Sequence, residues 1–256
     1  MWRPKELEQR LEGVLEAQYH HLHPFNLRMH AGHLSRRELQ LWVANRYYYQ
    51  QMIPVKDCLL MSKLPTEFRR EWITRVIYHD GQNDGEAGLA AWRALGEAVG
   101  LEAGVLEGHT LLAPGVKFAT DGYVNFIRDQ PWFDGVASSL TELYAHRIMA
   151  VRTVAFETHY PWVSAEGLAY FRSRNRQANV EADDALRILN ASTSSHDDQL
   201  RVVAAMRFKC SVLWSLLDAL EAQTVRAGQG CATDCLTARG CALTVSYRFR
   251  MISYTF

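Results

Sequence analysis

Apolar residues recur every three or four positions along most of the chain, the spacing that places them on one face of an α-helix. In the first segment, residues 5–18, the pattern is carried by Leu7, Leu11, Val14 and Leu15. Equivalent patterns predict further helices over residues 35–53, 66–79, 86–99, 114–126, 132–156, 164–189 and 195–222. Before residue 240 no segment alternates apolar and polar residues in the manner of a half-buried strand. The sequence therefore predicts an all-α protein.

Residues that start and stop helices fall at the ends of these segments. Ser35 and Glu38 form a capping box at the start of one helix, and Pro54 is expected to end or kink that helix. Gly100 suits the C-terminus of another helix. No internal repeat or Gly/Ser-rich linker divides the first 220 residues. We therefore expect residues 1–220 to form a single compact bundle of about seven helices around one core.

The last part of the chain, residues 221–256, has a different composition. Gly and Thr replace the helical pattern, and Cys231, Cys235 and Cys241 lie close together. The final residues, ALTVSYRFRMISYTF, alternate like an isolated strand, which has no partner in an all-helical domain. The three cysteines could bind zinc, but no fourth ligand stands nearby in a usual spacing. We interpret this part as a C-terminal extension, disordered or non-native, and expect no metal site.

Charge and composition restrict the class of protein. The chain has 28 basic and 28 acidic residues, which argues against bulk attraction to nucleic acid or to an anionic membrane. No apolar run is long enough to cross a bilayer, and the charged N-terminus has a helical period rather than the features of a secretory signal. The sequence therefore predicts a soluble, cytoplasmic protein that binds neither nucleic acid nor membrane.

Charged and hydrogen-bonding side chains recur one helical turn apart within otherwise apolar or aromatic helices. Arg46 and Gln50 are four residues apart beside Tyr49, and Tyr170 and Arg174 have the same spacing. The other positions of this kind are Lys56, Arg75, His79, Glu142, His146, Arg152 and Lys209, and Met149 lies on the same stripe as Glu142 and His146. A buried cation without a counter-charge costs several kcal/mol. If these cations converge, we expect an anionic guest to complete the site, and a ligand with several carboxylates suits arginine well.

Simpler interpretations remain open for each pair. Taken singly, a pair is typical of a solvated helix face with ion pairs along the helix. The histidines that precede Pro24 lack carboxylate or cysteine company as metal ligands. Glu142 and His146 could form half of a metal site, but the matching helix offers Tyr170 and Arg174, which argues against a di-iron centre. No glycine-rich nucleotide motif and no serine-hydrolase motif occurs.

Several long blocks resemble the pyrroloquinoline-quinone synthase family. They are YHHLHPF, WVANRYYYQQMIPVKD, HDG at 79–81, LGEAVGL, LAPGVKFATDGYVNF, SSLTELYA, HYPW, GLAYFRSR and RFKCSVLWSLLDAL. They run in uninterrupted order from about residue 15 to residue 220. The resemblance implies a haem-oxygenase-like all-α fold and a homodimer. It also implies an oxidase without metal or organic cofactor, which completes ring closure and oxidation of a polycarboxylate quinone precursor.

In that family oxygen accepts the electrons, hydrogen peroxide is formed, and the quinone product can stay bound. The resemblance assigns His79 as the principal proton-transfer residue, with Tyr170, Arg174 and His20 as further catalytic residues. It also implies a set of pocket residues. These are Tyr19, Arg46, Tyr49, Gln50, Lys56, Arg75, Tyr123, Glu142, His146, Met149, Arg152 and Lys209.

One position departs from the family pattern. Met149 stands where the family usually has a histidine, and a methionine cannot donate a proton. We hypothesise that His146, one turn earlier, supplies the missing imidazole. Two other functions stay open: a non-catalytic carrier of the finished quinone, which Met149 favours, and a thiaminase-like hydrolase on the same fold. The hydrolase would need a cysteine nucleophile facing a carboxylate, and neither Cys58 nor Cys210 has such a partner in the sequence.

Overall fold

The computed structural model describes residues 1–81 and 88–233, and within these ranges it contains helices and no strand. The long helices are α1 (Pro4–Gln18), α3 (Arg36–Met61), α4 (Thr66–Asp80), α5 (Gly88–Ala98), α7 (Pro114–Asp129), α9 (Glu142–His159), α10 (Ala169–Ser192) and α11 (His196–Thr233). The short ones are α2 (Pro24–His30), α6 (Ala103–Glu107) and α8 (Trp132–Ser138), with 3₁₀ turns at His20–Leu22, Ser139–Thr141 and Glu166–Leu168. The all-α prediction is confirmed, and the long helices agree with the expected bundle.

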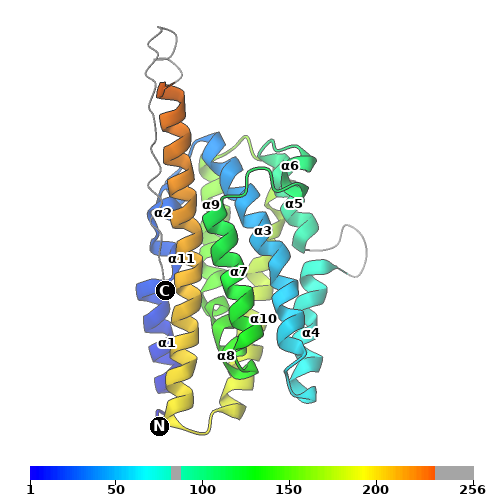
Figure 1. The fold of residues 1–256 in the computed structure, drawn as a ribbon, viewed down its shortest axis with the longest axis vertical. Helices are drawn as coiled ribbons and strands as arrows, with labels where there is room; N and C mark the ends of the chain where they lie inside the picture. Colours follow the sequence, from blue (N-terminus) through cyan, green and yellow to red (C-terminus); the bar gives the residue numbers. More distant parts are fainter. Residues whose placement is uncertain (82–87, 234–256) are drawn as a thin grey trace, which may run out of the picture.

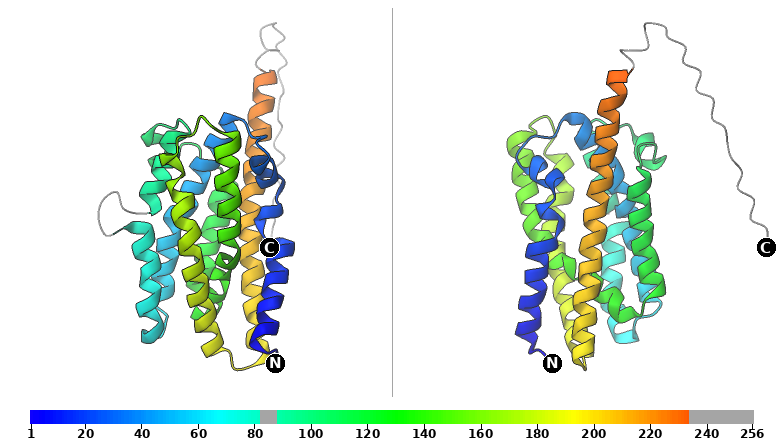
Figure 2. Two further views of the ribbon diagram at one scale, coloured as in Figure 1. Left: turned by 180° about the vertical axis from the view of Figure 1, so that it is seen from behind. Right: turned by 60° about the vertical axis from the view of Figure 1, so that its left-hand side comes forward.

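The long helices run roughly along the long axis of the molecule (Figure 1). Helix α9 packs on α10, α11 packs on α7 and α8, and α3 packs on α4 and α7. Helix α1 lies along the outside of α11, and the C-terminal end of α11 projects beyond the other helices (Figure 2). No helix in the described residues is both long and apolar enough to cross a membrane.

An aromatic cluster fixes α10 against its neighbours. Trp92 of α5 makes edge-to-face contacts with Trp42 of α3, at 5.4 Å between ring centroids, and with Tyr170 of α10, at 4.7 Å. Phe156 of α9 and Phe171 of α10 pack at 5.3 Å. Such aromatic pairs contribute about 0.5–1.5 kcal/mol each beyond the area they bury. The cluster therefore holds the segment of α10 that carries Tyr170 and Arg174.

Pro54 lies inside α3 rather than at its end. The capping box of Ser35 and Glu38 is present, but the helix continues past Pro54 to Met61, so the expected end at residue 53 is wrong. A proline within a helix cannot donate to the carbonyl four residues earlier, which here belongs to Gln50. The helix tolerates this loss because it is packed against α4 and α7.

Two other predicted boundaries differ from the structure. The helix expected over residues 132–156 is broken by the 3₁₀ turn Ser139–Thr141, because the Ser138 hydroxyl donates to the Gly135 carbonyl at 2.7 Å and competes with the helical pattern. Helix α11 passes the expected end at residue 222 and continues to Thr233, since adding residues to an existing helix costs little. The predicted C-terminal strand lies outside the described residues.

Candidate active site

Most of the predicted site residues lie inside the bundle. Those that are at most 7% exposed are Tyr19, His20, Tyr49, Gln50, Lys56, Arg75, His79, Tyr123, Met149, Arg152, Tyr170, Arg174 and Lys209. Arg46, Glu142 and His146 are half-buried. These side chains come from α3, α4, α7, α9, α10, α11 and the segment between α1 and α2. Polar groups from separate helices therefore meet in the interior, and the simpler interpretation of solvated helix faces does not hold for them.

A narrow pocket lies among these side chains. Its lining residues are Tyr19, Arg46, Tyr49, Gln50, Ile53, Thr141, Glu142, Ala145, Met149, Tyr170, Arg174 and Leu213. The cavity measures about 20 Å³, which is room for roughly one water molecule. Pockets that hold multi-ring ligands usually measure several hundred Å³. A guest of that size can enter only if some of these side chains or helices move apart.

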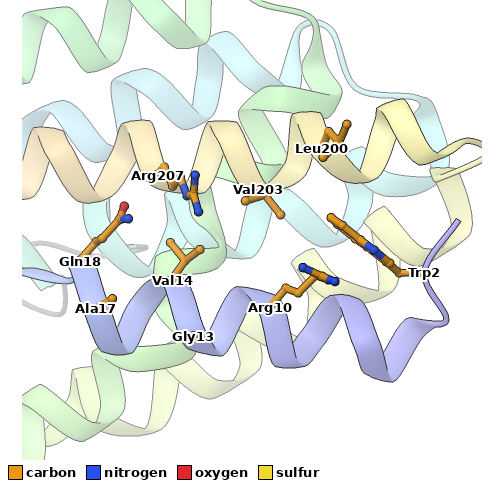
Figure 3. Close-up of a pocket in the computed structure, with 9 residues that line it drawn as sticks. All are labelled: Trp2, Arg10, Gly13, Val14, Ala17, Gln18, Leu200, Val203 and Arg207. Atoms are coloured by element: carbon orange, nitrogen blue, oxygen red, sulfur yellow. The ribbon is translucent and has the colours of Figure 1, made fainter.

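A larger hollow between α1 and α11 lies on the outside of the bundle (Figure 3). This groove measures about 390 Å³ and contains none of the predicted site residues. The Arg10 guanidinium stacks on the Trp2 ring at 4.1 Å, which covers one end of the groove. The predicted site residues therefore mark the narrow interior pocket, and not this surface groove, as the candidate active site.

Three of the buried cations are paired with carboxylates of the chain itself. Lys56 contacts Asp57 at 2.6 Å, and Asp57 also accepts a hydrogen bond from the Trp72 indole at 2.8 Å. Arg75 and Arg174 share the carboxylate of Glu181, at 2.9 Å and 2.7 Å. The expectation that these cations need an external anion is therefore wrong for this group, which we call the paired cations (Lys56, Arg75 and Arg174).

Arg174 is held from two sides. Glu142 of α9 contacts it at 2.6 Å, and Glu181 lies seven residues further along α10. Burial lowers the pKa of Arg174, but Glu142 and Glu181 outweigh it and hold the pKa well above its usual value. Burial raises the pKa of Glu181, but Arg174 and Arg75 outweigh it and hold the pKa well below its usual range. Arg174 and Glu181 therefore both stay charged at any moderate pH.

The other three cations of the predicted site have no carboxylate partner among the described residues. They are Arg46, Arg152 and Lys209, here called the unpaired cations. Arg46 stacks on the Tyr49 ring at 4.0 Å, and Arg152 stacks on Trp42 at 4.9 Å. Lys209 donates to the Tyr49 hydroxyl and lies 3.3 Å from the centre of the Tyr123 ring. Aromatic faces lessen the cost of burying a cation but carry no full negative charge.

The unpaired cations repel one another. Burial and the nearby Arg46 lower the pKa of Arg152 to about 9. Burial, Lys56 and Arg46 lower the pKa of Lys209 well below its usual value. An anion placed among these groups would remove the repulsion and raise both pKa values again. This part of the interior therefore favours negative charge.

His79 is buried at the end of α4, and neither ring nitrogen has a hydrogen-bond partner among the described residues. Gly81 follows it with φ of 84°, which ends the helix. Gly88 approaches it closely, since a Cβ there would come within 3.2 Å of Tyr78 and 3.6 Å of His79 Nδ1. Burial and Arg174 lower the pKa of His79 to about 3. The imidazole is therefore neutral near pH 7 and does not titrate near its reference pKa.

His20 is linked to an unpaired cation through an asparagine. Arg152 donates to Asn26 Oδ1 at 3.1 Å, and Asn26 Nδ2 donates to His20 Nδ1 at 2.8 Å. His20 Nδ1 is therefore the acceptor, and its proton lies on Nε2. Burial, Arg46 and Arg152 lower the pKa of His20 well below its usual value. His20 is thus a second neutral imidazole in the interior.

The tyrosines complete the polar lining. Tyr170 donates its hydroxyl to Gln50 Oε1 at 3.0 Å, and Tyr123 and Ser138 share a hydrogen bond of 3.1 Å. Burial raises the pKa of Tyr19, Tyr49, Tyr123 and Tyr170 above the usual value for a phenol. All four therefore remain protonated and present O–H donors.

Met149 lines the pocket, but His146 is not among its lining residues. His146 is half-buried one turn earlier on α9, and its Nδ1 has no hydrogen-bond partner among the described residues. The structure therefore does not place the His146 imidazole beside Met149 in the pocket lining. The hypothesis that His146 replaces the family histidine gains no support from this geometry.

Several important residues are absent from the sequence prediction. Glu181, Asp57 and Asn26 carry the hydrogen bonds and ion pairs that hold Arg174, Lys56 and His20. Glu181 offered one signal, since it lies seven residues after Arg174 and therefore near the same face of a helix. Asn26 offered none, because its contact depends on how the turn at 20–22 folds back onto α2.

Comparisons with known proteins agree with this geometry. The profile of the TENA/THI-4/PQQC family matches residues 9–219. The chain belongs to this family. It is 46% identical over 226 residues to a pyrroloquinoline-quinone synthase of Granulibacter bethesdensis, covering 88% of this chain and 89% of that protein. A protein of the same name from Acinetobacter baylyi is 41% identical over 223 residues, covering 86% and 87%.

Solved structures place the fold. A TenA homologue from Pseudomonas syringae pv. tomato superposes with a TM-score of 0.69 at 13% identity, covering 84% of this chain and 93% of that one. A domain with a haem-oxygenase-like fold from Shewanella denitrificans gives a TM-score of 0.63 at 12% identity, covering 88% and 93%. The haem-oxygenase-like fold expected from the sequence is confirmed.

Proposed function

We propose that this protein is an oxidase that completes ring closure and oxidation in the biosynthesis of pyrroloquinoline quinone. Its substrate is a bicyclic precursor with several carboxylates, and oxygen is the electron acceptor. Each two-electron oxidation moves two electrons and two protons from the ring system to O₂, which becomes hydrogen peroxide. The high identity to curated pyrroloquinoline-quinone synthases over most of both chains supports this proposal.

The observation that carries the proposal is the set of unpaired cations beside a closed interior pocket. Arg46 lines the pocket. Its charge lowers the pKa values of Arg152 and Lys209, so both cations lie close to it. A buried guanidinium gains most from a carboxylate that binds it through two hydrogen bonds. A polycarboxylate guest supplies the carboxylate partners that these three cations lack among the described residues.

The chain's own groups then handle protons and charge. His79 and His20 are neutral imidazoles, so each can accept a proton from the substrate. The anionic substrate raises their pKa values on binding, which strengthens them as bases. Tyr49 and Tyr170 keep their protons. Tyr49 can donate a hydrogen bond to an oxygen atom of the reduced ring, and Tyr170 can do so in exchange for its hydrogen bond to Gln50. Arg174 lines the same pocket, and because Glu142 and Glu181 balance its charge, it chiefly holds the pocket wall in position.

The reaction is proposed to need neither a metal nor an organic cofactor, as the family resemblance implies. The conjugated ring of the substrate can hold electrons and pass them to O₂. Adding a chelator to the purified protein is therefore expected to leave oxygen uptake unchanged. Loss of uptake on chelation, restored by a divalent metal, would contradict this part of the proposal.

One experiment separates an oxidase from a carrier. The protein is mixed with the precursor without oxygen, and an oxygen pulse follows while oxygen and peroxide are measured. An oxidase consumes oxygen and releases peroxide with each turnover, whereas a carrier binds the finished quinone and consumes nothing. Consumption no faster than that of the precursor alone would contradict the proposal.

The described residues that line the interior pocket do not offer the cysteine nucleophile that the hydrolase alternative requires. Cys58 is exposed on α3, away from the pocket lining, and Cys210 lines a groove against α1. Burial raises the pKa of the Cys210 thiol to about 11, which makes it a poor nucleophile near neutral pH. A thiol-blocking reagent is therefore expected to leave activity unchanged.

We further propose that the protein is a cytoplasmic homodimer, as the resemblance implies. The described helices include none that could span a membrane. Sedimentation velocity at micromolar concentration tests the assembly. A single species at the monomer mass of 29.2 kDa would contradict the dimer.

A further inference from the structure

Among the described residues that line the interior pocket, Met149 carries the only sulfur. It lies on α9, is 7% exposed, and shares the lining with Tyr19, Arg46 and Tyr170. The pocket in which it lies is small, with room for about one water molecule. Any small molecule formed in this pocket is therefore formed close to the thioether of Met149.

The reaction proposed above forms such a molecule. If the protein reduces O₂ to hydrogen peroxide in this pocket, the peroxide must leave past its lining. A thioether reacts with peroxide through the sulfur lone pair and, unlike a thiol, needs no deprotonation. The histidine that the family usually has at this position offers no such sulfur. The inference that follows therefore depends on the proposed oxidase function.

We propose that Met149 is oxidised to the sulfoxide by the peroxide formed in its own pocket, and that each molecule loses activity as its turnovers accumulate. One peroxide oxygen is transferred to Sδ while the O–O bond breaks and water leaves. The sulfur loses two electrons and the peroxide gains two. No reactant is needed beyond the product of the reaction itself.

The sulfoxide is expected to block the pocket in two ways. It adds an oxygen atom where the cavity holds only about one water molecule, so the surrounding side chains must shift. It also introduces a strong hydrogen-bond acceptor among Arg46, Tyr49 and Arg174, all of which line the same cavity. Arg46 has no carboxylate partner among the described residues, so a sulfoxide oxygen would compete for it with the anionic substrate.

Other methionines serve as internal references. Met1 is 76% exposed, whereas Met29 and Met206 are fully buried in the core. Peroxide that arrives from solution should oxidise the exposed Met1 first, because susceptibility follows exposure. Peroxide formed inside the pocket should oxidise Met149 first. The order of oxidation therefore reports where the peroxide originates.

The experiment compares two treatments of the full chain. In one, the protein turns over the bicyclic precursor with O₂ in the presence of catalase, which destroys released peroxide. In the other, hydrogen peroxide is added without precursor or catalase. Peptide mass spectrometry then measures sulfoxide at each methionine. We expect Met149 to exceed Met1 by at least about fivefold during turnover, and the order to reverse with added peroxide.

Substitution gives the second arm. Met149→Leu removes the sulfur at similar volume, and its activity loss per completed turnover should fall at least about threefold, whatever its initial rate. Met61→Leu, at a half-buried methionine of α3 outside the pocket lining, should lose activity as the parent does. Methionine sulfoxide reductase should restore the activity of the spent parent protein.

Three results would overturn the inference. The first is that Met149 stays reduced while oxygen is consumed. The second is that Met149 becomes oxidised only when catalase is omitted. The third is that Met149→Leu loses activity per turnover as fast as the parent. Absence of oxygen uptake is a different failure. It would remove the proposed oxidase function, and this inference with it, and the oxygen trace identifies that case.

Discussion

The paired and the unpaired cations of the interior look alike in the sequence and differ in the structure. Arg75 and Arg174 share Glu181, and Lys56 lies against Asp57, so these positive charges are balanced within the chain. Arg46, Arg152 and Lys209 stack on or hydrogen-bond only to aromatic rings, a phenol or an amide among the described residues. The paired cations stabilise the fold, whereas the unpaired cations are available to bind a ligand.

This difference teaches that burial of a cation does not by itself indicate a binding site. Removing one member of a buried ion pair leaves the other charge uncompensated, which costs about 3–5 kcal/mol. Removing an unpaired buried cation relieves repulsion instead. Stability and ligand affinity should therefore respond oppositely in the two groups, and the following changes are chosen to break or sharpen that contrast.

The largest effect is expected from Glu181→Ala. It leaves Arg75 and Arg174 buried without their shared carboxylate, and the free energy of unfolding should fall by about 3–5 kcal/mol. Urea denaturation followed by circular dichroism measures this. Asp129→Ala removes the exposed pair with Arg128 and serves as the control, with an expected change within about 0.5 kcal/mol. Equal effects of the two changes would mean that the network around Glu181 is not structural.

The next effect concerns pH. The pKa of His79 is lowered to about 3 in the folded protein, whereas the unfolded chain binds a proton near pH 6.5. Between these values the unfolded state holds more protons, so stability is lost as pH falls. The contribution of His79 to the free energy of unfolding should therefore fall by about 3 kcal/mol between pH 7 and pH 4.

His79→Gln removes that proton uptake. Whatever its effect at pH 7, the variant should lose less stability than the parent on acidification, and urea denaturation at several pH values measures the slope. His33→Gln is a suitable control, since it changes a histidine outside the interior pocket. Parallel curves for parent and His79→Gln would show that this imidazole is not buried in its neutral form.

The smallest effect is expected at His146. Because this histidine does not line the pocket, His146→Ala should change the rate of oxygen uptake by less than about threefold. Unchanged turnover would rule out the hypothesis that His146 replaces the family histidine. A loss of about 100-fold or more, with normal folding, would instead place His146 in the chemistry and contradict the geometry described above.

Much of the fold follows from local pattern. The apolar period predicts the long helices because one face of each is buried, and Ser35 with Glu38 marks the start of α3. Pro54 could not be interpreted in the same way. Its cost to α3 is local, whereas the packing that offsets this cost comes from α4 and α7, distant in the sequence.

The site was predictable as a set of residues but not as a network. Spacing and resemblance identify Arg75 and Arg174, yet nothing in the sequence shows that both meet Glu181. The pKa of His79 likewise depends on burial and on Arg174, which another helix supplies. Which cations are paired, and which histidines are neutral, are consequences of tertiary packing.

The most direct test of the account compares Arg152→Met with Arg75→Met. Calorimetry without oxygen measures the affinity for the bicyclic precursor, and urea denaturation measures stability. We predict that Arg152→Met binds the precursor about 10- to 100-fold more weakly while its stability is kept, since a hydrogen bond to a charged group contributes about 1.5–3 kcal/mol. Arg75→Met should chiefly lose stability. Unchanged affinity in Arg152→Met, or a loss of affinity in Arg75→Met with no loss of stability, would contradict the division into structural and ligand-binding cations.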